Sequence, residues 1–523
     1  MLGLELVVII GAIVLGVGVL ARRVRIAPPI LLLVAGVALG FVPLLREVRL
    51  PPEVVLLLFL PALLYWESLT TSLREIRSNL RSVVLTSTLL VVLTAAVVAV
   101  VAHAVGLPWA AAWVLGAAVA PTDATATAAL ASGMPRRTLT TLRAESLVND
   151  GTALVILALA IEASARGAEI TPLHVGLRLL DSYGGGIAIG LAIACIAARL
   201  RKRLDDALEE NVVSLLSPFA AYLLAELIGA SGVLAVVVCG LAMSQVGPRI
   251  AGAGTRSQMN AFWSLSTVLL NGALFVLVGI ELQVSIRGLD GAQILLGLVA
   301  VGVVVVALVV TRFGFFFASG AVIRLLERTP ERRASLMSNR ARLVSSVAGF
   351  RGAVSLAAAL SVPATTASGA DFPRRDIVVF VTAGVIAITL VLQGVVLPLI
   401  VRLVRLPPDE DVDRELLEAE RTATQEALAA LDDLAEEASA GERAVRRSRK
   451  ELEAQLHAID RGEDEEPGED EQAIGQYEQL RLALVRRKRE VLVRLRDEGR
   501  IDDIVLRRIQ TRLDNEEIRL SAD

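Results

Sequence analysis

Residues 144–156 read AESLVNDGTALVI, and this stretch decides the fold. It places Glu145, Asn149 and Asp150 inside a run that is otherwise as apolar as a membrane-spanning helix. A charged side chain at the centre of a bilayer costs about 2.5–3.5 kcal/mol on insertion scales, so it persists where a polar interior or a binding site needs it. Residues four apart share one face of a helix, so Glu145 lies near Asn149, and Ser146 near Asp150. The stretch therefore predicts a transmembrane helix with one polar sector.

Apolar runs of similar length recur along most of the chain. Hydrophobic residues make up 54% of the 523 residues, which is unusual for a soluble protein. We therefore predict an all-α polytopic membrane protein over residues 1–407, with about thirteen spans. The expected spans cover roughly residues 2–21, 28–46, 53–68, 82–103, 108–132, 139–163, 174–198, 211–228, 230–246, 260–283, 291–323, 341–365 and 376–406.

Residues 408–523 form a second predicted region. They are dense in Asp, Glu and Arg and contain helical stretches on both sides of an acidic linker, residues 461–472. We expect a helical cytoplasmic tail. Two roles stay open for it: helices that pack on each other or on a second copy of the chain, and a regulator of the transmembrane part.

The connections between spans alternate in basic content, which predicts the orientation. The richer set includes residues 22–25, 199–203 and 324–342, and the poorer set has few arginines. Basic loops stay in the cytoplasm. We expect an uncleaved first helix, an outside N-terminus and a cytoplasmic tail. The Arg-over-Lys bias and heavy use of Ala and Val suggest a bacterial protein, hence the bacterial plasma membrane.

Ionisable residues of several spans converge on one depth. Pro121 should break the span 108–132, because proline lacks an N–H and clashes with the preceding turn. Asp123 follows this break, about 15 Å from the cytoplasmic end, and Asp150 lies at about 16 Å. Arg312 and Arg351 reach similar depths, and Gly349 and Gly352 permit a second unwound segment around Arg351.

The buried acids, including Glu67 nearer the cytoplasm, outnumber the two arginines. We hypothesise that a cation or a proton neutralises the remaining negative charge, so that the acids form an ion site that is filled alternately.

Five segments resemble the monovalent cation/proton antiporters of the NhaP type, which are related to the animal sodium/proton exchangers. PTDATA (121–126) is similar to the family's broken fifth helix, ESLVND (145–150) to its sixth-helix motif, and GFRGAVSLAAAL (349–360) to its other crossing helix. FWSLSTVLLNGALFVLVGIEL (262–282) and SGVLAVVVCGL (231–241) also read like family segments. The resemblance covers most of residues 1–406.

The resemblance implies thirteen spans in two inverted repeats with broken crossing helices, a core domain that moves against a dimerisation domain, and a homodimer. It makes Asp150 the essential acid, which binds either a cation such as Na⁺ or protons. The other implied ion ligands are Asp123, Ser146, the backbone of Thr122, and Glu67.

The resemblance also implies supporting contacts. Asn149 would link the crossing helices, Glu145 would pair with Arg312, and Asp123 with Arg351. Whether Asp123 contacts the ion or only pairs with Arg351 stays open, as does ion ligation by Glu67. The Asn-Asp pair suggests electroneutral exchange, since relatives with Asp-Asp tend to be electrogenic. Arg143 departs from animal members, which often carry an apolar or small residue there.

We therefore expect a secondary transporter that exchanges Na⁺, or Li⁺ or K⁺, for H⁺ by alternating access. A K⁺/H⁺ exchanger on the same scaffold is the closest alternative. An ion channel would need a filter-like sequence, and a membrane-anchored signalling protein a docking or enzymatic motif in the tail; the sequence shows neither. It also shows no nucleotide loop, metal-ligand cluster or nucleophile motif, so we expect no enzyme, no cofactor and no nucleic-acid partner. Na⁺ (or K⁺ or Li⁺), H⁺ and membrane lipid are the expected partners.

Overall fold

The structure is a computed structural model of the chain, and helices dominate what it describes. It describes residues 2–24, 26–42, 55–123, 134, 136–166, 172–204, 206–250, 253–326, 338–349, 351–363, 365, 372–404, 410–437 and 441–461. Its contacts divide the chain into two units, Met1–Pro408 and Asp409–Asp523.

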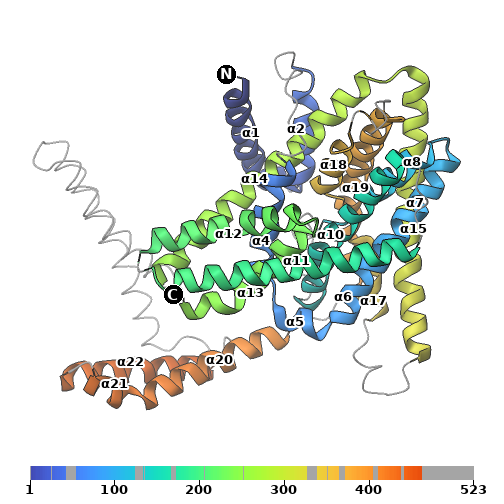
Figure 1. Ribbon diagram of the computed structural model, residues 1–523. Coiled ribbons are helices and arrows are strands. Elements are labelled where there is room, and N and C mark those ends of the chain that lie inside the picture. Colours follow the sequence, from blue (N-terminus) through green and yellow to red (C-terminus); the bar gives the residue numbers. More distant parts are fainter. Residues whose placement is uncertain are drawn as a thin grey trace, which may run out of the picture. The chain divides into compact units, whose positions relative to one another are not determined.

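The first unit is all-helical in the residues described (Figure 1). Its helices are α1 (Leu2–Val24), α2 (Pro28–Leu39), α4 (Leu60–Thr70), α5 (Leu73–Ser78), α6 (Leu80–Val84), α7 (Leu90–Ala104), α8 (Trp109–Val119), α10 (Arg136–Arg166), α11 (Pro172–Arg201), α12 (Ala207–Leu227), α13 (Gly232–Ile250), α14 (Ala253–Arg287), α15 (Gly291–Leu326), α17 (Asn339–Val347), α18 (Ala353–Leu360) and α19 (Arg375–Val404). Two π-helical turns, η2 (Val55–Phe59) and η3 (Leu85–Leu89), precede α4 and α7.

Within the described residues, seven stretches are long and apolar enough to cross a membrane. They are α1, α10, α11, α14, α15, α19 and the stretch Ser82–Ala104, which joins α6, η3 and α7. Shorter apolar helices occur at Pro28–Leu39, Leu57–Thr70, Trp109–Val119 and Gly232–Gly247. The all-helical, multi-span fold is confirmed, and the count of thirteen spans stays a prediction.

Both expected helix breaks are present. Helix α8 ends at Val119, and residues 121–123 are not helical, as the missing N–H of Pro121 predicts. The continuation of this span, residues 124–133, lies outside the described residues. The expected span 341–365 is divided into α17 and α18, separated by a non-helical segment that contains Gly349, Arg351 and Gly352.

Small residues allow the long helices to pack closely. A side chain at Gly36 of α2 would collide with the Val276 carbonyl of α14, and one at Gly279 of α14 with the Leu33 carbonyl of α2. Helices α11 and α13 lie side by side in the same way, with Gly190 against the Ala235 carbonyl (Figure 1). Backbone approach through glycine is the usual packing device of helices in lipid, where helices gain nothing from excluding water.

A buried ion pair that the sequence analysis did not anticipate joins α11 to α12. Arg201 Nη2 lies 3.2 Å from Glu210 Oε2, and both side chains are less than a tenth exposed. Thr255 Oγ1 of α14 donates to Glu210 Oε1 at 3.3 Å. This cluster joins the ends of three helices.

The second unit contains α20 (Glu410–Ala429), α21 (Leu431–Glu437) and α22 (Glu442–Arg461) in its described part. Helices α20 and α22 contact each other, and Arg449 of α22 lies 2.8 Å from Asp432 of α21. The expected helical stretches after residue 461 lie outside the described residues.

Candidate ion-binding site

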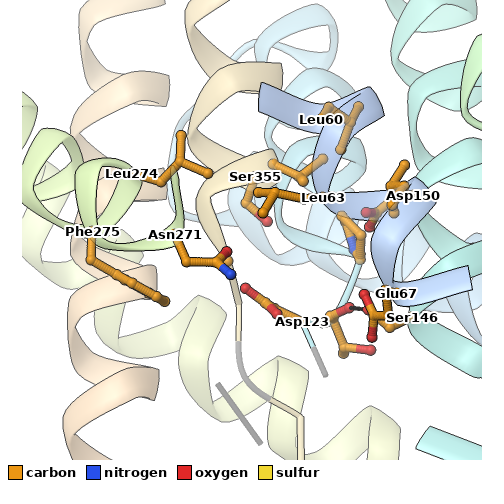
Figure 2. A pocket seen from close by; sticks show the side chains of 15 residues that line it. Leu60, Leu63, Glu67, Asp123, Ser146, Asp150, Asn271, Leu274, Phe275 and Ser355 are labelled. Carbon is orange, nitrogen blue, oxygen red and sulfur yellow. Dashed lines mark hydrogen bonds between the residues drawn. The ribbon is translucent and has the colours of Figure 1, made fainter. Parts of the chain in front are cut away.

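A cavity lies where the two breaks meet the acidic motif. Figure 2 shows its wall, to which α4, the segment after α8, α10, α14 and α18 contribute. It is lined by Leu60, Leu63, Leu64, Glu67, Pro121, Thr122, Asp123, Ser146, Asp150, Asn271, Leu274, Phe275, Gly352, Val354 and Ser355. All five predicted ion ligands therefore lie on one cavity, although they come from three separate elements.

Helix α10 holds the broken segment through hydrogen bonds to Thr122. The Thr122 carbonyl accepts from Ser146 Oγ at 2.9 Å and from Asn149 Nδ2 at 3.2 Å. Asn149 Nδ2 also donates to Thr122 Oγ1 at 2.8 Å, and Thr122 Oγ1 donates to Glu145 Oε1 at 3.4 Å. A broken helix exposes backbone carbonyls that lipid cannot satisfy, and the polar sector of α10 supplies the donors.

Arg312 of α15 joins Glu145 to the end of α17. Its Nη1 lies 2.6 Å from Glu145 Oε1, and both side chains are at most 5% exposed. Its Nε donates to the Ser345 carbonyl at 3.0 Å, and its Nη2 to the Ala348 carbonyl at 3.5 Å. The guanidinium thus neutralises a buried carboxylate and also satisfies carbonyls at the negative end of a half-helix.

Arg351 likewise donates hydrogen bonds to backbone carbonyls, one of them at the end of α8. Its Nε donates to the carbonyl of Val119, the last residue of α8, at 2.9 Å, and its Nη1 donates to the Gly349 carbonyl. Arg351 is 3% exposed. The pairing of Asp123 with Arg351 that the resemblance implies stays a prediction.

The acids of the cavity differ in their surroundings. Asp150 is 5% exposed, and among the described residues its carboxylate has neither a hydrogen bond nor an ion pair. Asp123 lies against α18, because a Cβ atom at Gly352, the residue that precedes this helix, would collide with its carboxylate. Glu67 of α4 is half-buried. Both arginines bond to other groups, so Asp150 is the buried carboxylate of this cavity that is left without a counter-charge in direct contact.

Two wall residues were not predicted as part of the site. Asn271 of α14 lies on the cavity with its amide turned toward Asp123 (Figure 2). Ser355 of α18 was not singled out, although it is buried on the same wall. Only the polar character of Asn271 within an apolar run could have signalled its place. A serine in a helix gives no such signal, since it usually bonds to its own backbone.

A second, smaller cavity borders the non-helical segment after α8 and the acidic motif of α10. Thr86, Thr94, Asn149, Arg312 and Arg351 are among its lining residues. The buried Oδ1 atom of Asn149 has no hydrogen-bond partner in the described structure. A polar pocket of this kind suits a buried water molecule.

Comparison with known proteins gives the family. The family described as "Sodium/hydrogen exchanger, transmembrane" matches residues 9–403. The chain belongs to the sodium/hydrogen exchanger family. This exchanger-family chain is 42% identical to an uncharacterized Na⁺/H⁺ exchanger of Mycobacterium tuberculosis, over 98% of this chain and 95% of the relative. The family is one of membrane-embedded antiporters, and this exchanger-family chain has the multi-span helical architecture expected of it.

More distant relatives cover less of the exchanger. A sodium, potassium, lithium and rubidium/H⁺ antiporter of Bacillus subtilis is 32% identical, over 56% of this chain and 45% of the relative. The structure of the sodium proton antiporter MjNhaP1 from Methanocaldococcus jannaschii matches with a TM-score of 0.57 at 19% identity, covering 76% of this chain and 98% of that chain. This likeness confirms the NhaP-type antiporter fold.

Proposed function

We propose that this exchanger transports a monovalent cation, Na⁺ foremost, in exchange for H⁺ by alternating access. One observation carries the proposal: the carboxylate of Asp150 is buried on a polar cavity and has no bonded partner among the described residues. A buried carboxylate without a counter-charge is neutralised either by a proton or by a cation. Because one group serves both ligands, each excludes the other, and exchange becomes obligatory.

The remaining ion ligands are proposed from the wall of the same cavity. Ser146 Oγ donates its proton to the Thr122 carbonyl, and Ser146 lies on the wall of the cavity, where a hydroxyl oxygen is a suitable ligand for a cation. Asp123 and Glu67 add carboxylate oxygens. The Thr122 carbonyl already accepts two hydrogen bonds, which occupy both lone pairs. It therefore binds the ion only if one of these bonds is released.

Electroneutral exchange follows from the environment of Asn149. This residue cannot carry a proton between the two sides, and its amide is held by Thr122. With Asp150 as the carboxylate that alternates between proton and cation, one cation replaces one proton.

K⁺/H⁺ exchange on the same site is the second candidate. The Bacillus subtilis relative is named for potassium, lithium and rubidium as well as sodium. All four ions carry one charge and take oxygen ligands, so cavity size and ligand number decide among them.

The test is proton flux in proteoliposomes, driven by Na⁺, K⁺ or Li⁺ gradients with and without a membrane potential. We expect Na⁺ to drive the fastest flux, at a rate that an imposed potential does not change. Flux driven by a K⁺ gradient and not by a Na⁺ gradient would show that K⁺ is the substrate. Proton flux that depends on no cation would contradict the proposal.

The surroundings of the transporter are also proposed. Its place is the bacterial plasma membrane, with the N-terminus outside and the tail in the cytoplasm, and the active form is a homodimer. Residues 408–523 regulate exchange. Cysteine scanning with a membrane-impermeant thiol reagent tests the orientation, since the expected cytoplasmic sites must resist labelling in intact cells.

A further inference from the structure

The hydroxyl of Ser355 is an unexplained polar group on the wall of the ion cavity. Ser355 lies in the first turn of α18 and is 1% exposed. Its Oγ atom has no hydrogen-bond partner in the described structure (Figure 2). Buried hydroxyls are normally bonded, so an unbonded one on the wall of a cavity is a candidate for contact with whatever occupies that cavity.

Other hydroxyls of the site are already committed as donors. Ser146 Oγ donates to the Thr122 carbonyl, and Thr122 Oγ1 donates toward Glu145. Ser346, in the other half of the same broken helix, is also buried, but it donates to the Arg342 carbonyl at 2.7 Å. Ser355 therefore differs from a serine that satisfies its own helix backbone.

The wall of the cavity that Ser355 lines carries apolar side chains as well as the acids. Leu63, Leu274 and Phe275 are among the residues that share the cavity, and all three are apolar. The carboxylate of Asp123 lies against Gly352, three residues before Ser355 on the same helix end. A polar occupant of the cavity would thus meet the hydroxyl close to the charged part of the site.

We propose that Ser355 Oγ is a further oxygen ligand of the transported cation. This inference rests on the proposed function. A desolvated alkali cation needs several oxygen ligands, and the Thr122 carbonyl is occupied by two hydrogen bonds. Ser355 provides a neutral oxygen from α18, the element opposite the acidic motif of α10.

The experiment compares Ser355→Ala and Ser355→Thr with Ser346→Ala as the matched control. Cation-driven proton flux in proteoliposomes gives the KM and the maximal rate for Na⁺, Li⁺ and K⁺. We expect Ser355→Ala to raise the KM for the preferred cation about tenfold, the usual size for one lost bond to a charged group, with the maximal rate nearly unchanged. Ser355→Thr retains the oxygen and should restore the KM, and Ser346→Ala should leave it unchanged.

Thermal unfolding in detergent separates this role from a structural one. Because Ser355 Oγ has no hydrogen-bond partner among the described residues, Ser355→Ala without cation should unfold at the temperature of the unaltered protein or above it. Added Na⁺ should stabilise the variant less than the unaltered protein, since a ligand stabilises in proportion to its binding.

Two results overturn the inference while exchange itself stands: a KM unchanged for all three cations, or a loss of stability in Ser355→Ala without cation. If the unaltered protein exchanges no cation, the proposed function fails. In that case the role of Ser355 is judged from the unfolding temperature alone. If Na⁺ raises the unfolding temperature of Ser355→Ala and of the unaltered protein equally, Ser355 is not a cation ligand.

Discussion

Arg312 contributes more to the structure than its partner Glu145. The guanidinium bonds to one carboxylate and to two carbonyls of the other broken helix, whereas the carboxylate accepts from Arg312 and Thr122. Removing one member of a buried pair leaves an unpaired charge, which costs about 3–5 kcal/mol.

The first prediction ranks the two members of this pair. Arg312→Gln should lower the free energy of unfolding by more than Glu145→Gln does, because it also frees two carbonyls. Chemical or thermal unfolding in detergent measures both. The control is Arg178→Gln, which breaks an exposed pair with Glu162 at 3.9 Å and should change the free energy by less than about 1 kcal/mol. Equal losses in Arg312→Gln and Arg178→Gln would contradict the role of the buried pair.

The second prediction concerns Asp150. Asp150→Asn should abolish cation-driven proton flux in proteoliposomes and leave the unfolding temperature unchanged or raised, because the substitution removes a buried carboxylate that has no bonded partner in the described part of the chain. The control is Asp290→Asn at the exposed start of α15, where asparagine caps a helix as well as aspartate does. Normal flux in Asp150→Asn would remove this residue from the mechanism.

At the scale of elements, the two broken helices meet through a glycine. Gly352 has backbone angles that any residue can adopt, so its small size and not its flexibility matters here. An added methyl group would occupy the position of the Asp123 carboxylate.

The third prediction follows from that contact. Gly352→Ala should displace Asp123 and raise the KM for the cation at least about tenfold, as expected when one charged ligand is moved. Gly314→Ala is the control, because a side chain at Gly314 in α15 meets no atom within 4 Å. Flux kinetics in proteoliposomes measure both variants, and equal KM values would show that Asp123 does not need this contact.

The helix breaks could be predicted from local sequence, whereas part of the candidate site depends on tertiary packing and could not. Pro121 and the glycines on both sides of Arg351 weaken a helix locally, and the sequence alone suggested both breaks. This signal is not decisive by itself, because Pro218 and Pro398 stay inside helices α12 and α19. The family resemblance suggested only a carboxylate partner for Arg351. The structure shows two carbonyl partners, which exist because the helices end there. Ser355 and Asn271 reach the cavity only through the packing of α18 and α14, and no spacing rule contains that information.

At the scale of the whole molecule, the division into two units makes the tail separable. The described part of the second unit has its own contacts, including the pair between Arg449 and Asp432. The fourth prediction is that a chain ending at Pro408 folds and retains cation-driven flux. The expected change is in the pH at which flux is half-maximal, because we propose a regulatory tail. Flux at an unchanged pH would reduce the tail to a passive role, and loss of folding would show that the two units depend on each other.

The central claim is that one carboxylate binds either a cation or a proton. Proton release on cation binding tests it most directly. The purified protein, in weakly buffered acidic solution, is titrated with Na⁺ while the released protons and the bound Na⁺ are both measured. We predict close to one proton released per Na⁺ bound, and neither binding nor release in Asp150→Asn. Na⁺ binding without proton release, or equal release in Asp150→Asn, would contradict the account.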